Sequence, residues 1–378
     1  MENKEPESKE NSNSVPKKNR ITKPLTVLAG VLVFLILAVM LTMHFYLSKI
    51  NIVDQISAAV NEKAEYVLEK TRHIEGRPLS QTEVESMQKT IDKNAAKKVV
   101  ANMYEDNVIN VLLIGSDARK VGSSSRSDTM ILLSVNKRTK EITVTSLMRD
   151  IYLAIPGHGY NRLNAAYAFG GSDLALDTIE KNFKIHVDKF VEVNFYTFIK
   201  VVDDLGGVTV DVLDNDNELR TINSSIEEIN YYSDDDQNDG KLKHGGRLHL
   251  NGKQTLGYVR NRYYYDGDFT RTENQRAVVT QLSSIVFKLT PEQAHRLLSK
   301  YLPLVSTNLS ETEMMSLLVY MPEFKNYKIN QICIPTEDSF EYCRIRKMSV
   351  LQVDFEKNIK NTTKTIYGEP EKPKVETN

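Results

Sequence analysis

The stretch NVLLIGSDARKVGSSSRSDTMILLSVN, residues 110–136, joins two hydrophobic runs through a polar loop. The first run, residues 108–114, is apolar except for Asn110, as expected of a strand buried on both faces. The second run, residues 130–135, is rich in Ile, Leu and Val and predicts another strand. Because one loop connects them, the end of the first strand and the start of the second are expected at the same edge of a sheet.

The connecting loop carries two aspartates, each two residues from an arginine. Asp117 follows the first strand and is close to Arg119, whereas Asp128 precedes the second strand and is close to Arg126. Two carboxylates with open space between them suit Mg²⁺, which usually takes one or two carboxylates and completes its shell with phosphate oxygens. The planar fork of arginine suits phosphate. The loop therefore indicates a metal-bridged phosphate or pyrophosphate site.

A third predicted strand, residues 142–147, runs back along the second and brings Arg149 and Asp150 to the same edge. The alternative is a surface network of salt bridges, because Asp in a loop rich in Gly and Ser is often only part of a turn. The loop alone leaves both interpretations open.

A second cluster of charged residues lies in LGYVRNRYYYDGDFTRTENQ, residues 256–275. We expect a strand over residues 256–262, which would point Arg260 and Arg262 to the same face. Three more polar residues follow near the start of a helix predicted for residues 272–289, where backbone N–H groups favour anions: Asp268, Arg271 and Gln275. A strand with two arginines on one face either faces water or binds an anion.

The N-terminal region predicts a membrane anchor. Residues 25–47 contain no acidic or obligately basic side chain and are long enough to cross a hydrocarbon core of roughly 30 Å as a helix. The preceding segment is basic and is expected in the cytoplasm: Lys17, Lys18, Arg20 and Lys23. The chain after the anchor is then extracytoplasmic. A cleaved signal peptide is the alternative, but the apolar stretch is long for one.

The rest of the chain predicts one α/β domain. We expect a cytoplasmic disordered tail at 1–23, the anchor at 24–48, a helical stalk at 49–106, the domain at 107–367 and a polar tail at 368–378. Strands alternate with helices in the domain, which predicts a central mixed sheet flanked by helices. Cys333 and Cys343 either form a disulfide or remain free.

Seven motifs occur in a fixed order: LLIGSDAR, RSDTMILLSV, SLMRD, RLNAAYAFGG, VVDDLGGV, LNGKQTLGYVRNR and DFTRTENQ. Together they resemble the LytR–CpsA–Psr family of membrane-anchored cell-wall proteins. The resemblance implies a mixed sheet between helices, an apolar cavity for a polyprenyl chain and a pyrophosphate at its mouth. It implies transfer of a teichoic acid or capsular polysaccharide from a polyprenyl (undecaprenyl) pyrophosphate carrier to peptidoglycan, assisted by Mg²⁺, with Mn²⁺ as a substitute.

The resemblance also assigns residues. It implies metal ligands at Asp117 and Asp128. It implies a pyrophosphate-binding set: Arg126, Arg149, Arg260, Arg262, Arg271 and Gln275. Asp268 and Asp150 are candidates for the general base, and Arg149 is the third residue expected to take part in catalysis. The chain departs from many members in having Arg162 for a lysine and Asn274 for an arginine.

The expected reaction is attack of a peptidoglycan hydroxyl on the phosphorus that carries the glycopolymer, which releases polyprenyl phosphate and forms a phosphodiester. Under this hypothesis Arg260→Ala and Arg262→Ala each abolish transfer. One alternative is a phosphatase or pyrophosphatase that uses water as acceptor. Another is a non-catalytic envelope sensor or transcription attenuator. Direct contact with nucleic acid is not expected, because only about 24 residues precede the anchor's apolar stretch and they contain no helix-turn-helix pattern.

Overall fold

The computed structural model describes residues 51–52, 76–98, 107–116, 127–262 and 267–368. All of them belong to one compact unit, residues 49–378. The predicted anchor and both predicted tails lie outside these ranges, apart from Gly368, the first residue of the second tail. Within the described ranges, each helix is too short or too polar to span a bilayer.

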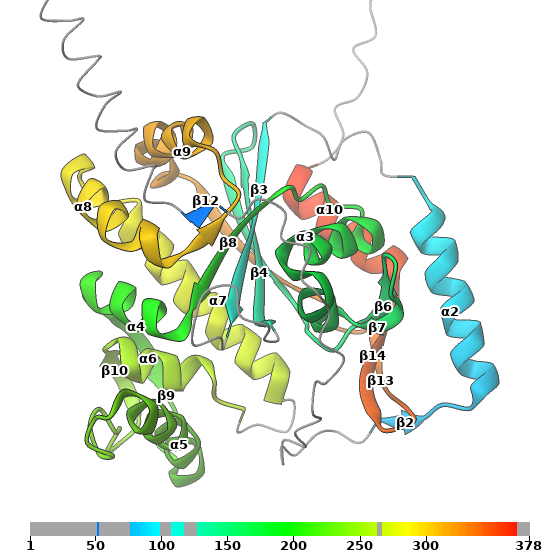
Figure 1. Cartoon of the computed structure of the whole chain (residues 1–378), viewed down its shortest axis with the longest axis horizontal. Helices are drawn as coiled ribbons and strands as arrows, with labels where there is room; N and C mark the ends of the chain where they lie inside the picture. The colour runs from blue at the N-terminus through cyan, green and yellow to red at the C-terminus, as the bar shows by residue number, and fades with distance from the viewer. Residues whose placement is uncertain (1–50, 53–75, 99–106, 117–126, 263–266, 369–378) are drawn as a thin grey trace, which may run out of the picture. The chain divides into compact units, whose positions relative to one another are not determined.

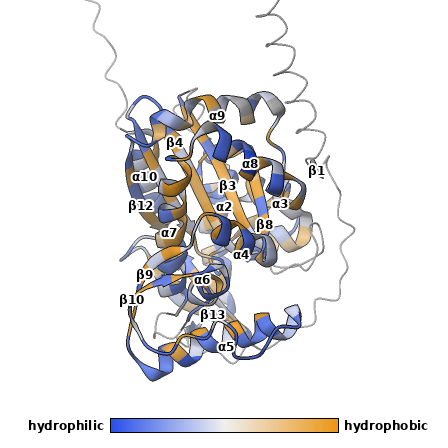
Figure 2. Ribbon diagram, turned by 90° about the vertical axis from the view of Figure 1, so that its left-hand side faces the viewer, coloured by the Kyte–Doolittle hydropathy of each residue, from blue (hydrophilic) through white to orange (hydrophobic). Residues whose placement is uncertain are grey.

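A seven-stranded mixed sheet forms the centre of the domain and confirms the predicted fold class (Figure 1). From one edge to the other, its strands are β1 (Asn51–Ile52), β11 (Ser306–Thr307), β8 (Lys189–Asn194), β3 (Val108–Ser116), β4 (Ser127–Asn136), β5 (Glu141–Leu147) and β12 (Lys328–Ile334). Strand β4 is antiparallel to both β3 and β5, as the opening stretch predicts. The strands β3 and β4 are largely hydrophobic along their length (Figure 2), because helices cover both faces of the sheet.

One face of the sheet packs against a large hydrophobic core. The elements on this side are α2 (Gln81–Ala96), β6 (Tyr152–Ile155), β7 (Gly159–Arg162), α3 (Leu163–Phe183), β13 (Phe340–Ile345), β14 (Met348–Val353) and α10 (Phe355–Tyr367). Leu112 and Leu132 of the sheet are fully buried in this core. Met87 and Ile91 of α2 belong to it as well. The helix predicted as part of a stalk is therefore an integral part of the domain.

The opposite face of the sheet is covered by α7 (Gly267–Val286), α8 (Pro291–Tyr301) and α9 (Glu311–Phe324) (Figure 1). Val135 and Ile142 of the sheet pack there with Phe324 of α9 and with Phe287, which follows α7. The short 3-10 helix η2 (Leu302–Leu304) leads from α8 into β11. Strand β2 (Arg77–Pro78) pairs with β13.

A second hydrophobic cluster lies beyond one end of the sheet. It is built from α4 (Phe195–Asp204), β9 (Val208–Val212), α5 (Asp216–Ser233), β10 (Gly246–Leu250) and α6 (Gly252–Val259), with Val278 of α7. Helix α4 begins directly after β8, where the side chain of Asn194 accepts a hydrogen bond from the backbone N–H of Thr197. The second hydrophobic cluster therefore begins directly at the carboxyl end of β8.

The strand predicted for residues 256–262 is wrong, because this region contains the end of helix α6. The start of the helix has a capping box, in which Asn251 and Gln254 each bond the other's backbone N–H. Gly252 lets α6 pack closely on α4, since a Cβ there would lie 2.1 Å from the carbonyl oxygen of Ile199. The cap and the close packing together favour a helix here, instead of the strand that the sequence predicts.

The two cysteines are free and do not form a disulfide. Cys333 lies on β12 opposite Ser146 of β5, whereas Cys343 lies on β13 opposite Val350 of β14. The two strands belong to different sheets, so the spacing in sequence does not produce a hairpin.

Candidate active site

The candidate site forms at one end of the central sheet. Ser116 at the end of β3 pairs with Ser127 at the start of β4, and Ser146 near the end of β5 pairs with Ile131. Arg149, two residues after β5, therefore reaches the same end of the sheet as the loop between β3 and β4. The strand register thus confirms that Arg149 lies at the expected end of the sheet.

A β-bulge marks the start of β4. The pairing shifts from Gly115–Thr129 to Ser116–Ser127, which leaves Asp128 as the extra residue on β4. Bulges often change the direction of a side chain next to a functional site. The predicted metal ligand Asp128 thus lies at an irregular position of the backbone, and its side chain is outside the described part. Asp117 and Arg126 also lie outside the described residues.

Asp268 near the start of α7 is the centre of an ionic cluster. Its carboxylate lies 3.7 Å from Nε of Arg149, 3.3 Å from Nε of Arg262 and 3.1 Å from Nη2 of Arg271. The three arginines come from the segment after β5, the segment after α6 and the helix α7. The segment after β5 and the distant region around the start of α7 therefore meet at one carboxylate.

Asp150 extends the cluster toward β7. Its Oδ1 accepts a hydrogen bond of 2.9 Å from Nη1 of Arg162, and its Oδ2 lies 3.6 Å from Nε of Arg149. Arg149 is therefore placed between the two carboxylates. Arg162 keeps the positive charge that the family resemblance places before LNAAY, and the structure shows that it holds Asp150.

The cluster combines burial with excess positive charge. Each of its six side chains is at most 16% exposed: Arg149, Asp150, Arg162, Arg262, Asp268 and Arg271. Four guanidinium groups against two carboxylates give a formal charge of +2. Excess positive charge in a partly desolvated site is costly unless an anion compensates it. The cluster therefore favours a polyanionic ligand.

Burial raises the pKa of Asp268 above its usual value. Arg149 and Arg262 act in the opposite direction, and the nearby Asp150 raises the pKa further. A carboxylate with a raised pKa is a stronger base than an ordinary aspartate, as a general base requires.

Arg271 shows where an anion could bind. Its side chain is only 3% exposed. Its Nε and Nη1 are buried and have no hydrogen-bond partner among the residues that the structure describes. Buried donors without partners are costly, and phosphate oxygens would satisfy them.

Gln275 lies on α7, one helical turn after Arg271. It is buried, and its Nε2 donates a 3.4 Å hydrogen bond to the carbonyl of Val259 at the end of α6. The neighbouring Asn274 donates to the carbonyl of Tyr258 in the same way. The two amides hold the end of α6 against α7, just before Arg260 and Arg262. Asn274 thus has a structural contact at the position where the resemblance implies an arginine.

Arg260 and Arg262 do not share a face. Arg260 is the C-cap of α6 and forms a 2.9 Å ion pair with Glu228 of α5, while its guanidinium lies 5.2 Å from the ring centre of Phe195. Between them, Asn261 is fully buried and donates to the carboxylate of Glu218. The structure therefore brings Arg262 into the ionic cluster and leaves Arg260 outside it.

Sequence reasoning also missed a buried carboxylate. Glu192 on β8 is 5% exposed and accepts a 3.3 Å hydrogen bond from the hydroxyl of Ser116. In the sequence, Glu192 could have been noticed as the single acidic residue of the strand 189–194. Through its bond to Ser116, Glu192 brings a carboxylate to the end of β3, one residue before Asp117.

Comparison with known proteins points to one family. The model of the LytR_cpsA_psr family matches residues 78–366. The chain is 32% identical over 287 residues to the polyisoprenyl-teichoic acid–peptidoglycan teichoic acid transferase TagU of Enterococcus faecalis, covering 73% of this chain and 88% of the relative. It is 36% identical over 198 residues to TagU of Bacillus subtilis, covering 52% of this chain and 58% of that protein. The regulatory protein MsrR of Staphylococcus aureus is 33% identical over 195 residues, 50% of this chain and 54% of MsrR.

Solved structures agree with the fold. Protein gbs0355 from Streptococcus agalactiae superposes with a TM-score of 0.58 and 26% identity, covering 74% of this chain and 94% of that one. A structure of TagT bound to LIIa-WTA superposes with a TM-score of 0.55 and 25% identity, covering 72% of this chain and 92% of that one. The residues that the family model matches, 78–366, include the ionic cluster at the end of the sheet.

Proposed function

The chain belongs to the LytR–CpsA–Psr family, and on this premise we propose that it transfers a teichoic acid or a related glycopolymer from a polyprenyl-pyrophosphate carrier to peptidoglycan. The names of the TagU relatives support a transferase of this kind. The observation that carries the proposal is the buried ionic cluster around Asp268, whose formal charge of +2 suits a pyrophosphate. Capsular polysaccharide is the alternative glycopolymer.

The proposed reaction forms one P–O bond and breaks another. A hydroxyl of peptidoglycan attacks the phosphorus that carries the glycopolymer, and polyprenyl phosphate leaves with the electron pair of the broken bond. Asp268 accepts the hydroxyl proton. Arg149, Arg262 and Arg271 stabilise the negative charge on the equatorial and leaving oxygens, which is the main requirement of phosphoryl transfer.

Asp150 has a positioning role in this scheme. It holds Arg149 through one carboxylate oxygen and Arg162 through the other. Arg162 keeps Asp150 in place with its 2.9 Å hydrogen bond. Loss of either residue would misdirect Arg149, and the reaction is sensitive to displacements of about 1 Å.

Mg²⁺ is part of the proposal. Asp117 directly follows Ser116 in sequence, and Asp128 is the extra residue of the bulge at the start of β4. Their positions in the sequence, next to these two strand ends, support the proposal of two carboxylate ligands. The ion would neutralise charge on the pyrophosphate oxygens. The proposal also places the domain outside the cell on a single-pass type II anchor at residues 24–48.

The test uses the full-length chain in detergent with a polyprenyl-pyrophosphate-linked glycan, uncross-linked peptidoglycan and Mg²⁺. Mass spectrometry of the products should show a new phosphodiester between the two polymers. Arg262→Ala serves as the inactive control, and Arg296→Ala, an exposed arginine on α8, serves as the matched active control. Chelation of Mg²⁺ should abolish the product.

Other outcomes would point to the other functions. Release of phosphorylated glycan without peptidoglycan would identify a hydrolase. An intact lipid-linked substrate with a folded protein would favour a non-catalytic sensor; the relative MsrR is named a regulatory protein. Either result would overturn the transferase.

A further inference from the structure

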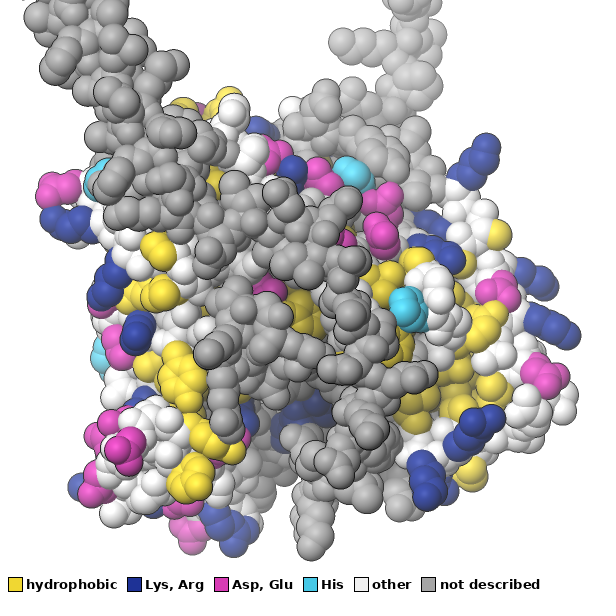
Figure 3. All heavy atoms as spheres, in the orientation of Figure 1, with side chains coloured by type: hydrophobic (Ala, Val, Ile, Leu, Met, Phe, Trp, Pro, Cys, Tyr) yellow, Lys and Arg dark blue, Asp and Glu magenta, His cyan; other side chains and the backbone are white. Residues whose placement is uncertain are grey.

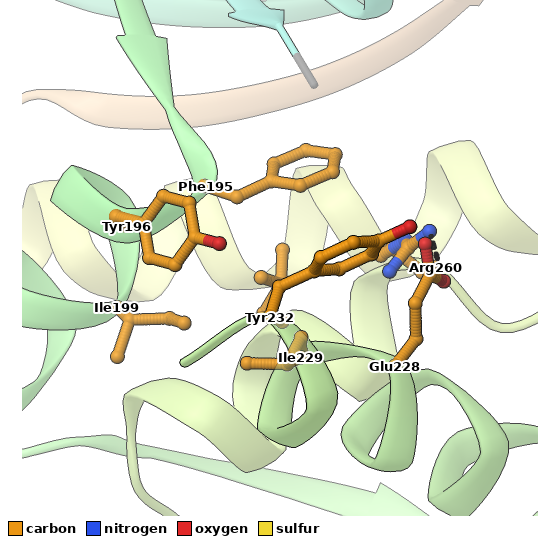
Figure 4. A pocket seen from close by; sticks show the side chains of 8 residues that line it. Phe195, Tyr196, Ile199, Glu228, Ile229, Tyr232 and Arg260 are labelled. Atoms are coloured by element: carbon orange, nitrogen blue, oxygen red, sulfur yellow. Dashed lines mark hydrogen bonds and ion pairs between the residues drawn. The ribbon is translucent and has the colours of Figure 1, made fainter. Parts of the chain in front are cut away.

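A small pocket lies between α4, α5 and α6 and does not belong to the ionic cluster. Its volume is about 230 Å³. This is below the roughly 300–1,000 Å³ of sites for drug-sized ligands, and it suits a group as small as one sugar ring. Figure 4 shows the rings of Phe195, Tyr196 and Tyr232 around the hollow and the Arg260–Glu228 ion pair at its rim. The apolar part of the wall comes from Ile199, Ile229 and Leu256.

The chemistry of this wall matches a carbohydrate. Aromatic rings present flat apolar faces that the C–H faces of a sugar can cover, and tyrosines also supply hydroxyl groups. The Arg260–Glu228 pair offers donors and acceptors within the same rim. Tyr232 is 48% exposed, although it is a large side chain, and its neighbour Tyr231 is 71% exposed. Exposed aromatic side chains next to a pocket indicate a binding surface.

The pocket opens close to the candidate active site. Asn194, directly before Phe195, pairs with Ser116 at the end of β3. Along the sheet, β8 and β5 are three strand spacings apart, roughly 14 Å. Arg260 is two residues from Arg262, so their backbones are within about 7 Å. A glycan of a few sugars could therefore occupy the pocket and reach the ionic cluster.

The charge around the pocket indicates which polymer of the proposed reaction binds there, the teichoic acid or the peptidoglycan. Residues 214–243 carry nine acidic and three basic side chains, a net charge of −6. Figure 3 shows acidic side chains gathered at the lower left of the molecule, where Figure 1 places α5. A polyanionic teichoic acid would be repelled there, whereas an uncharged sugar would not.

We infer that the pocket between α4, α5 and α6 is the subsite for an uncharged N-acetylated sugar of the acceptor glycan strand. The inference rests on the proposed transferase and names the surface that holds its acceptor. The ring of the sugar stacks on Tyr232 or Tyr196, and its polar groups bond the Arg260–Glu228 rim. The donor pyrophosphate occupies the ionic cluster at the other side of Arg262.

The chain contains no tryptophan, which allows a direct binding test. The variant Tyr232→Trp places a single indole in the pocket of the full-length chain. The matched control is Tyr320→Trp, because Tyr320 is an exposed tyrosine on α9 that does not line the pocket. The probes are the neutral chitin tetrasaccharide and the anionic poly(glycerol phosphate), and the readout is tryptophan emission.

We expect the neutral tetrasaccharide to change the emission of Tyr232→Trp with saturation and to leave Tyr320→Trp unchanged. In the transfer assay, Tyr232→Ala should raise the KM for the acceptor about threefold to tenfold and leave the KM for the lipid-linked donor unchanged. Tyr232→Phe should retain most of the acceptor affinity, because it keeps the ring. Ile199→Phe, which fills the pocket, should mimic Tyr232→Ala.

The inference fails if the neutral tetrasaccharide has no effect on Tyr232→Trp, if both tryptophan variants respond equally, or if the anionic polymer binds more tightly. It also fails if Tyr232→Ala raises the KM of the donor instead. The emission test requires no turnover. Transfer by the wild-type chain with a silent Tyr232→Trp would refute the subsite alone, and glycan binding without transfer would refute only the transferase.

Discussion

Arg260 and Arg262 are two residues apart, and each forms an ion pair with a carboxylate, but their environments differ. Arg262 lies in the cluster around Asp268, where both side chains are at most 15% exposed. Arg260 pairs with Glu228 at the rim of a pocket, where the two side chains are 29% and 50% exposed. The first pair is shared with other arginines, whereas the second is a single pair over the ring of Phe195.

The difference shows how burial decides what an ion pair can do. In the cluster, positive charge exceeds negative charge in a desolvated place, so the excess is available for a polyanion. At the pocket rim, the charges of Arg260 and Glu228 balance each other and solvent screens the pair, so it contributes little to stability and can serve polar recognition. The following predictions test this contrast, from the largest expected effect to the smallest.

Asp268→Asn should lower the rate of transfer about 10²-fold to 10⁴-fold, because the amide cannot accept the proton of the attacking hydroxyl. The wild-type rate should fall with decreasing pH as Asp268 becomes protonated, at a higher pH than for an ordinary aspartate, since its pKa is raised. The measurement is the pH profile of single-turnover transfer. A variant with the wild-type rate and the same acid limb would remove Asp268 from the reaction.

The same raised pKa makes a prediction about stability. In the pH range between the unfolded and folded pKa values of Asp268, the folded state binds more protons than the unfolded state, so stability decreases as pH rises. Asp268→Asn lacks this titration. As pH rises through this range, the Tm of the variant should therefore increase relative to the Tm of the wild type. A difference that is constant with pH would contradict the assignment.

Arg262→Ala should lower transfer about 10²-fold to 10³-fold, the usual cost of removing one donor that stabilises transition-state charge. The fold should remain, because Asp268 keeps Arg149 and Arg271 as partners. Transfer and thermal unfolding are measured on the same preparation, with the exposed Arg296→Ala as reference. If Arg262→Ala loses both transfer and the folded state, the ionic cluster has a structural role only.

The sequence predicts the sheet end well because strand order there depends on local connections. The hairpin β3–β4 and the return of β5 follow from hydrophobic runs and one loop each, and they bring Arg149 and Asp150 to the end of β3. The family resemblance adds Arg262, Asp268 and Arg271, which the structure brings to one place.

The region after residue 250 was harder to predict. Apolar residues in GYV at 257–259 suit a strand or a helix equally, and the deciding contacts are tertiary: Gly252 against Ile199, and Asn274 and Gln275 on the end of α6. A helix that ends at Val259 sends Arg260 and Arg262 in different directions, whereas a strand would align them. The role of Gln275 as a clamp on α6 has no local signal in sequence.

Arg260→Ala should lower the efficiency of transfer by about tenfold, which is a smaller loss than for Arg262→Ala. The loss should come mainly from a higher KM for the acceptor. The reason is that Arg260 contacts Glu228 and Phe195 and lies outside the ionic cluster. Initial rates at varied acceptor and varied donor separate the two effects. An equal loss for both variants, expressed in kcat, would mean that Arg260 leaves Glu228 to bind the pyrophosphate, and the contrast between the two regions would disappear.

Glu228→Gln should change the free energy of unfolding by at most about 1 kcal/mol, because the Arg260–Glu228 pair is partly exposed and screened. The amide keeps the shape of the side chain and still accepts a hydrogen bond from Arg260, so the pocket rim should persist. Chemical denaturation at low and high salt provides the measurement, and salt should reduce the small difference further. A loss of several kcal/mol that salt does not change would show that this pair is as desolvated as the cluster around Asp268. Exposure would then no longer explain why one arginine is available to a polyanion and its neighbour is not.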